Sequence, residues 1–135
     1  MNNELLSRIL VHEGFRTKAY PDPLSGAEPF TFGHGLTYIT EDESIQIVKN
    51  RLQTIANTLD NIYPWARELE PAAHGVLIEM AFQMGAAGLG KFKLFLSALH
   101  VGDYHEAAKQ MLDSRWAKQT PARAAELSNI IRGLH

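Results

Sequence analysis

Apolar residues recur at steps of three and four along most of this chain, which predicts a mainly helical fold. A first helix is expected over residues 3–13, and a long amphipathic helix over about 41–59. After a break at Tyr63-Pro64-Trp65, residues 71–85 are apolar nearly all round, which favours the centre of a helical bundle. Further helices are expected over 91–100, after Asp103, and from Thr120 to about Arg132.

Local signals mark where these helices begin and end. Thr40 with Glu43, and Asp103 with Glu106, have the spacing of capping boxes. Thr120 is expected to cap the last helix with its hydroxyl, ahead of a first-turn proline. Glycines mark the expected helix ends: Gly14, Gly85, Gly88, Gly90 and Gly133.

Composition narrows the class of protein. The 135 residues are 45% hydrophobic and 21% charged, which is ordinary for a soluble globular protein, and the continuous pattern predicts a single domain over 1–135. With no cysteine there is neither a disulfide framework nor a thiolate metal site. The histidines do not have metal-ligand spacing, and His74 is expected to be a partly buried, hydrogen-bonded side chain.

Charge is unevenly distributed around a net charge of −2. Residues 1–60 hold five Lys or Arg against eight Asp or Glu, whereas residues 91–135 hold seven against four. This asymmetry would attract an anionic polymer, although a plain solvated surface explains it equally well. No basic run is interleaved with aromatic residues, so nucleic-acid binding is not expected.

Glu13 is the first candidate for chemistry. It falls on the apolar stripe of the first helix, in the last turn before Gly14, where the helix dipole is negative. Both features are expected to raise the pKa of its carboxyl, as a general acid requires. The alternative is that Glu13 turns to solvent or pairs with Arg16 or Lys18.

Asp22 and Thr31 follow on different local structures. Asp22 lies between two prolines in an extended or turn conformation, where an aspartate taken alone is more often a turn former. Thr31 alternates with Phe30 and Phe32, which predicts a short strand. Two glycines follow at Gly33 and Gly35, and glycines allow backbone to pass close to a ligand.

The segment EGFRTKAYPDPLSGAEPFTFGHGLT, residues 13–37, resembles the active-site segment of phage-type lysozymes, glycoside hydrolase family 24. The resemblance implies that Glu13 is the proton donor and that Asp22 and Thr31 hold the attacking water. The loop over residues 23–30, which follows Asp22, is longer than in the relatives.

The second half of the chain also resembles the helical lobe of that family, in AFQMG at 81–85 and SRWAKQTPAR at 114–123. The resemblance implies that Arg123 positions the acid Glu13. It further implies substrate contacts at Thr37, Phe82, Gln83, Phe95, Gln110 and Arg115. Phe82 is equally explained as core, Arg115 as a surface charge, and Trp116 is expected in the core of the lobe.

What the resemblance implies overall is an α+β lysozyme-like fold. A small catalytic lobe over about 13–40 would hold a short β-hairpin, and helix 41–59 would link it to a helical lobe over about 60–135 packed with helix 3–13. The cleft would lie between the lobes.

The implied activity is that of an inverting muramidase, which cleaves the β-1,4 bond between N-acetylmuramic acid and N-acetylglucosamine in peptidoglycan, for host-cell lysis. The implied partners are glycan strands, with no cofactor, metal or nucleic acid. Alternatives are a lytic transglycosylase or chitinase, or a non-catalytic peptidoglycan-binding module.

The N-terminal residues carry Glu4, Arg8 and Glu13 among the apolar ones, so they resemble neither a signal peptide nor a membrane anchor. We therefore expect a protein made in the host cytoplasm, and we expect a monomer because a cleft enzyme acting on an insoluble mesh gains little from assembly. It would act in the periplasm after a separate factor grants access.

Overall fold

The computed structural model of the chain describes residues 6–8, 10–11, 15–20 and 31–135. Most of the described residues lie in helices, which confirms the mainly helical fold. They divide into two compact units, residues 1–47 and residues 48–135. The expectation of a single domain with two lobes and a cleft between them stays a prediction.

The first unit holds a small antiparallel sheet. Residues 6–8 and 10–11 are helical, within the expected first helix. Strand β1 (Arg16–Tyr20) pairs with β2 (Thr31–Gly33), with Tyr20 opposite Thr31. Reciprocal backbone bonds of 2.8 and 2.9 Å between Phe32 and Leu36 then turn the chain back. The short strand expected around Thr31 is therefore confirmed.

Helix α2 (Glu41–Ile62) begins at the predicted capping box. The Thr40 amide donates to Glu43 Oε1 at 2.9 Å, and the Glu43 amide donates to Thr40 Oγ1 at 3.1 Å. Hydrogen bonds that the Glu43 carboxylate accepts, first from the Thr40 backbone and then from the Thr40 side chain, lower the pKa of Glu43. Because the folded-state pKa is the lower one, this stabilisation is present above the ordinary pKa of a glutamate and lost as the pH falls through the folded value.

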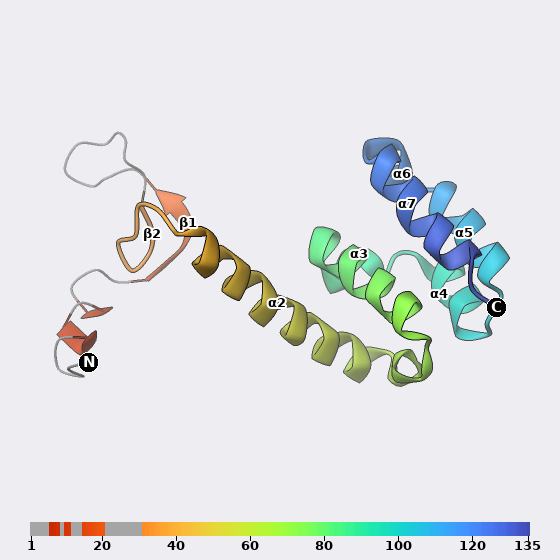
Figure 1. The fold of residues 1–135 in the computed structure, drawn as a ribbon, viewed down its shortest axis with the longest axis horizontal. Coiled ribbons are helices and arrows are strands. Elements are labelled where there is room, and N and C mark those ends of the chain that lie inside the picture. The colour runs from red at the N-terminus through yellow and green to blue at the C-terminus, as the bar shows by residue number, and fades with distance from the viewer. Residues whose placement is uncertain (1–5, 9, 12–14, 21–30) are drawn as a thin grey trace. The chain divides into compact units, whose positions relative to one another are not determined.

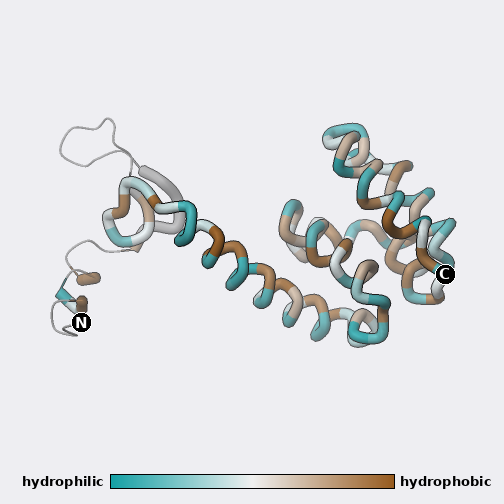
Figure 2. Tube along the Cα trace, viewed as in Figure 1, coloured by the Kyte–Doolittle hydropathy of each residue, from teal (hydrophilic) through white to brown (hydrophobic). Residues whose placement is uncertain are grey.

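Apolar and polar residues alternate along α2 with helical spacing, as Figure 2 shows in brown and teal. The helix runs three residues further than the expected end at 59, because the backbone ladder continues to Ile62. The amide of Tyr63 then donates to the carbonyl of Leu59 at 2.7 Å.

The second unit is a helical bundle (Figure 1). After the 3₁₀ helix η1 (Pro64–Glu68) come α3 (Pro71–Leu89), α4 (Lys93–His100), α5 (Tyr104–Leu112), α6 (Arg115–Gln119) and α7 (Pro121–Arg132). Helix α5 packs against α4 and α7, and α7 also contacts α3 and α6. The largest fully buried side chains of this unit include Leu77, Met80, Phe95, Leu99, Met111, Leu127 and Ile131.

Of the helix caps predicted for α5 and α7, the first is confirmed and the second is wrong. Asp103 accepts a 3.1 Å bond from the Glu106 amide, so the cap of α5 is confirmed. The prediction for Thr120 is wrong: its hydroxyl donates to the Trp116 carbonyl at 3.0 Å and makes no capping bond to α7. The reason is that Thr120 also ends α6. The last backbone carbonyls of a helix have no donor within it, and the Thr120 hydroxyl serves one of them. Pro121 opens α7 and Gly133 follows it, as expected.

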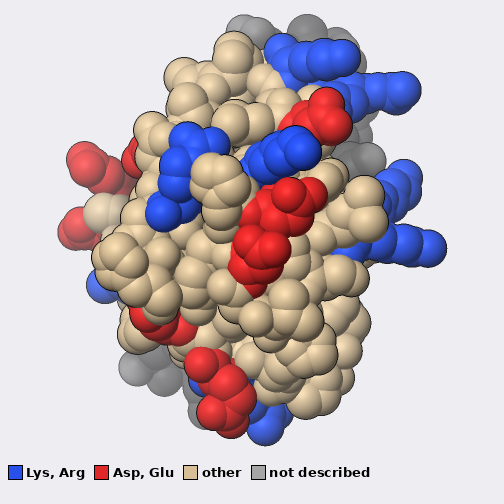
Figure 3. Space-filling model, turned by 90° about the vertical axis from the view of Figure 1, so that its right-hand side faces the viewer, with Lys and Arg blue, Asp and Glu red and all other residues tan. Residues whose placement is uncertain are grey.

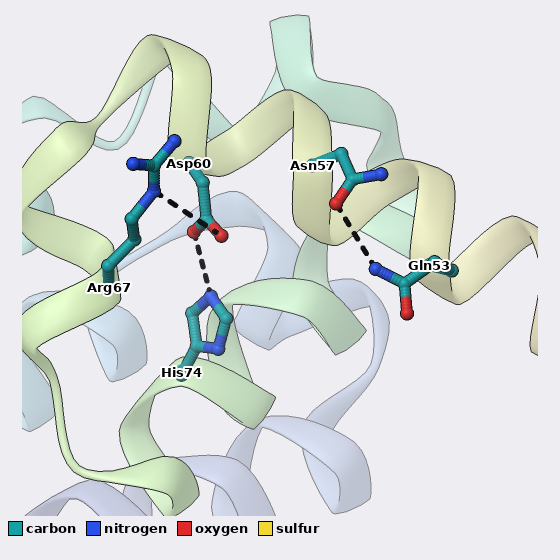
Figure 4. Close-up of polar contacts among 5 residues, drawn as sticks. All are labelled: Gln53, Asn57, Asp60, Arg67 and His74. Atoms are coloured by element: carbon teal, nitrogen blue, oxygen red, sulfur yellow. Dashed lines mark hydrogen bonds and ion pairs between the residues drawn. The ribbon is translucent and has the colours of Figure 1, made fainter.

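A polar cluster joins the end of α2 to η1 and α3 (Figure 4). Asp60 Oδ1 lies 3.0 Å from His74 Nε2, and Asp60 Oδ2 lies 3.9 Å from Arg67 Nε. His74 is thus a partly buried, hydrogen-bonded side chain, as expected. Across the described part of the chain, no three histidine or carboxylate side chains gather as a metal site would require, and no helix has the length and apolarity to span a membrane.

Helix α3 has a kink at Gly85, whose φ of 80° and ψ of 161° are non-helical. Only glycine adopts this backbone conformation without strain. The expected helix end at this position is therefore a break in direction, after which helical residues continue to Leu89. The kink separates the core-facing part of α3 from the segment that leads to α4.

We expect Gly85→Ala to lower the free energy of unfolding by about 1–3 kcal/mol, because the added Cβ disfavours the positive φ. A Cβ at Gly85 would meet nothing within 4 Å, so the cost is in the backbone alone. Gly75→Ala is the matched control, since a Cβ there is also free of contacts but lies in regular helix. It should raise stability by about 0.5–1 kcal/mol. Denaturant titration measures both; equal effects would contradict a strained Gly85.

Candidate functional site

The main candidate site is a cavity of about 510 Å³ within the helical bundle. It is built from the first turn of α4, the end of α5 and three residues of α6, Arg115, Trp116 and Gln119. Three of the substrate contacts expected from the sequence lie together in its wall: Phe95, Gln110 and Arg115. The other lining residues are Gly88, residues 91–94, residues 113–114, Trp116 and Gln119.

Aromatic rings form one wall of this cavity. Phe92 meets Trp116 edge-to-face with ring centroids 6.2 Å apart, and meets Phe95 in the same way at 6.5 Å. Such edge-to-face pairs add to the stability that burial provides. Phe95 itself is only 1% exposed, so it supports the wall from the core side. The cluster fixes α4 against α6.

Polar side chains of the cavity are held by local hydrogen bonds. The amide nitrogen of Gln110 donates to Glu106 Oε1 at 2.8 Å, which leaves the carbonyl oxygen of Gln110 to accept from a ligand. Ser114 Oγ donates to the Met111 carbonyl at 2.6 Å and accepts from the Ala117 amide at 3.2 Å. Ser114 therefore ties the end of α5 to the start of α6 and places Arg115.

Gln83 reaches the cavity wall through Trp116. The indole nitrogen of Trp116 donates to Gln83 Oε1 at 2.9 Å, across 33 residues of sequence. Trp116 is 7% exposed, which confirms its expected place in the core. Because the amide oxygen of Gln83 is occupied by the indole, its amide nitrogen is the group left to donate to a ligand.

Arg123 is paired with a carboxylate that the sequence did not suggest. Its Nε lies 3.4 Å from Glu79 Oε2 on α3, with side chains 47% and 44% exposed. The guanidinium presents further N–H donors beyond Nε, so this pair leaves it able to hold a second carboxylate. Its expected partner, Glu13, lies outside the described residues.

The remaining candidates lie elsewhere or outside the description. Asp22, like Glu13, is outside the described residues, and the Thr31 backbone is in β2. Thr37 is exposed after the turn that follows β2. Phe82 is 44% exposed rather than core, and lines a separate apolar hollow of about 340 Å³ with Val48, Leu52, Gly75, Ile78 and Glu79.

Sequence reasoning missed Lys91 and Lys93, which flank Phe92 at the cavity. The sequence did contain a signal for them: the two lysines alternate with Phe92 directly after the spaced glycines Gly85, Gly88 and Gly90. Nothing in the sequence pattern pointed to Glu79, because a partner on another helix is set by packing.

Comparison with known proteins places the chain in a family. The family model described as phage lysozyme matches residues 11–133, nearly the whole sequence. The chain belongs to the phage lysozyme family.

Several curated relatives are similar to this chain. Probable T4-type lysozyme 1 of Dictyostelium discoideum is 36% identical over 80 residues, which is 59% of this chain and 41% of that protein. Probable T4-type lysozyme 2 of the same organism is 32% identical over 90 residues, 67% of this chain and 49% of that protein. The pre-baseplate central spike protein Gp5 of Enterobacteria phage T4 is 46% identical over 55 residues, 41% of this chain and 10% of that protein. The chain thus spans half or less of the length of these relatives.

We expect Gln83→Leu to lower the free energy of unfolding by about 1–3 kcal/mol, because it leaves the buried Trp116 indole nitrogen without an acceptor. Trp116→Phe removes that donor, so Gln83→Leu should cost clearly less in a Trp116→Phe background. A double-mutant cycle by denaturant titration measures the difference. Additive effects would show that the bond contributes nothing.

Proposed function

We propose that this protein is a muramidase that hydrolyses the β-1,4 bond between N-acetylmuramic acid and N-acetylglucosamine in bacterial peptidoglycan. The observation that carries the proposal is the cavity on the helical bundle, in a chain of the phage lysozyme family, lined by Phe95, Gln110 and Arg115. Relatives named as T4-type lysozymes support the same reaction class.

The cavity has the chemistry that a sugar needs. Phe92 and Trp116 offer apolar faces and edges against which a pyranose ring packs, and Gln110 and Gln119 offer amide groups to its hydroxyl and N-acetyl groups. A concave site with few polar groups fixes orientation while apolar contacts supply affinity. The helical bundle would therefore hold the glycan strand.

In the proposed reaction Glu13 protonates the departing glycosidic oxygen as positive charge develops on the sugar. Asp22 and Thr31 hold a water molecule on the opposite face, so the anomeric configuration inverts. Inversion needs the two carboxyl groups roughly 6.5–9.5 Å apart, to leave room for the water. The support is the Glu13, Asp22 and Thr31 pattern in the matched family region.

Arg123 would orient the acid. Among the described residues its ion pair is with Glu79 through Nε, and the other guanidinium donors would serve the Glu13 carboxylate. A cation beside Glu13 opposes the rise in pKa that burial at a helix end would cause, so the two effects together would set the pH range of the enzyme. In a phage, the outcome would be host-cell lysis at the cell wall.

We expect Glu13→Gln to abolish release of reducing ends from purified peptidoglycan, because the amide cannot donate the proton. Glu126→Gln is the matched control, an exposed glutamate on α7 outside the cavity. Turbidity loss of permeabilised Gram-negative cells provides the second measurement. Near-normal activity of Glu13→Gln would defeat the assignment of the acid.

Product analysis separates the alternatives in the same experiment. Hydrolysis adds one water to each cleaved bond, whereas a lytic transglycosylase leaves an anhydro sugar of lower mass. Binding to peptidoglycan with no product from the wild-type protein would replace the muramidase by a wall-binding module. Cleavage of chitin at a comparable rate would show that the muramic acid is not required.

We expect Arg123→Ala to lower kcat about tenfold or more, because the acid loses the group that orients it. The free energy of unfolding should change by at most about 1 kcal/mol, since the pair with Glu79 is half exposed. Arg132→Ala, at the other end of α7, is the control. Equal kcat values for the two variants would remove Arg123 from the site.

A further inference from the structure

Three cationic side chains that line the cavity have no carboxylate partner among the residues that the structure describes. Lys91, Lys93 and Arg115 are all exposed and all line it. Among the residues that the structure describes, the ion pairs join Arg67 and His74 to Asp60, and Arg123 to Glu79, so none involves these three. Of the acids in the described part of the chain, only Asp113 lies in the cavity wall, which leaves a surplus of positive charge there.

The first turn of α4 adds to that charge. Helix α4 has no side-chain cap, because Phe92 stands at its N-cap position. The residues of this turn, from Lys93 to Phe95, line the cavity. Backbone N–H groups at a helix start carry partial positive charge and favour an anion nearby. The lysines and the helix end therefore act in the same direction.

The basic side chains that line the cavity, among the described residues, are Lys91, Lys93 and Arg115. On the face of the molecule shown in Figure 3, lysines and arginines protrude at separate places, with acidic side chains between them. A polyanion such as nucleic acid is held by a continuous basic surface. Separate basic positions beside a sugar-type cavity instead suit single charges attached to a bound glycan.

We propose that Lys91 and Lys93, with Arg115, recognise the free carboxylates of the stem peptides that peptidoglycan carries on its muramic acid residues. This inference rests on the proposed peptidoglycan substrate and names the form of it that the cavity prefers. The stem begins on the sugar itself, so a glycan held by the aromatic wall and Gln110 brings its carboxylates to the rim of the same cavity. Ammonium groups serve as point charges, and the Arg115 guanidinium can engage a carboxylate through two donors.

A carboxylate ligand explains the presence of Lys91, Lys93 and Arg115 at one cavity better than a neutral ligand does. Three unpaired cations around a neutral ligand would repel one another with no gain. A carboxylate near them forms charge-assisted hydrogen bonds, which are stronger than neutral ones. Lys91 and Lys93 thus determine specificity between stems with free carboxylates and stems with amidated ones.

The test compares two substrates and two variants. Peptidoglycan with intact stems is used as isolated, and a second portion has its carboxylates converted to primary amides. Wild type and the double variant Lys91→Gln/Lys93→Gln are assayed on both for KM and kcat. Lys118→Gln is the control, an exposed lysine of α6 that does not line the cavity. Binding of the same two polymers to the Glu13→Gln protein, and to Glu13→Gln with the two lysine substitutions, is measured by sedimentation.

Amidation of the substrate should raise the wild-type KM about tenfold with kcat little changed, since exposed charge pairs of this kind contribute modestly each. The double variant should show the same rise on the natural substrate and little further change on the amidated one. The control should behave as wild type does. Added salt should reduce the wild-type preference because it screens the charges.

Two results would overturn the inference: a wild-type KM and binding that do not respond to amidation, or a double variant impaired by the same factor on both substrates. Tighter binding to a phosphate-rich teichoic acid than to the peptide-bearing glycan would also overturn it. Absence of any product together with carboxylate-dependent binding would instead remove the muramidase function and keep the recognition of carboxylates.

Discussion

The contact of Trp116 with Gln83 and Phe92 is the interaction on which the cavity depends. Helix α6 has only five residues, too few to be stable by its own backbone bonds. Its position is fixed because the Trp116 ring is buried, bonded to Gln83 on α3 and packed edge-on against Phe92 beside α4. Once the ring is held, the neighbouring Arg115 can only project at the cavity rim.

In the proposed reaction, recognition and chemistry come from different parts of the sequence. Residues 88–119 supply the aromatic wall, the amides and the cations of the cavity, whereas the proposed proton donor and water-holding groups fall within residues 13–31. Under the proposed function, such a division would let binding energy from the bundle be spent on orienting the glycan for the acid.

Helices could be predicted from the sequence because their causes are local. The spacing of apolar residues and the caps at Thr40 and Asp103 act within one or two turns, and the structure has helices at these places. Thr120 was misassigned because it stands at the junction of two helices, where a hydroxyl can serve only one of them. Gly85 was read as a helix end, since a sequence does not distinguish a stop from a kink.

The sequence by itself determined the helical class, the family and the candidate acid, because a motif and a period are carried by neighbouring residues. Only the tertiary structure decided that Phe95, Gln110 and Arg115 share one cavity, that Phe82 faces another hollow, and that Glu79 holds Arg123. These contacts join residues on different helices, and their partners follow from how the helices pack. That Lys91 and Lys93 form no ion pair with another described residue is a finding of the same kind, since pairing depends on neighbours in space.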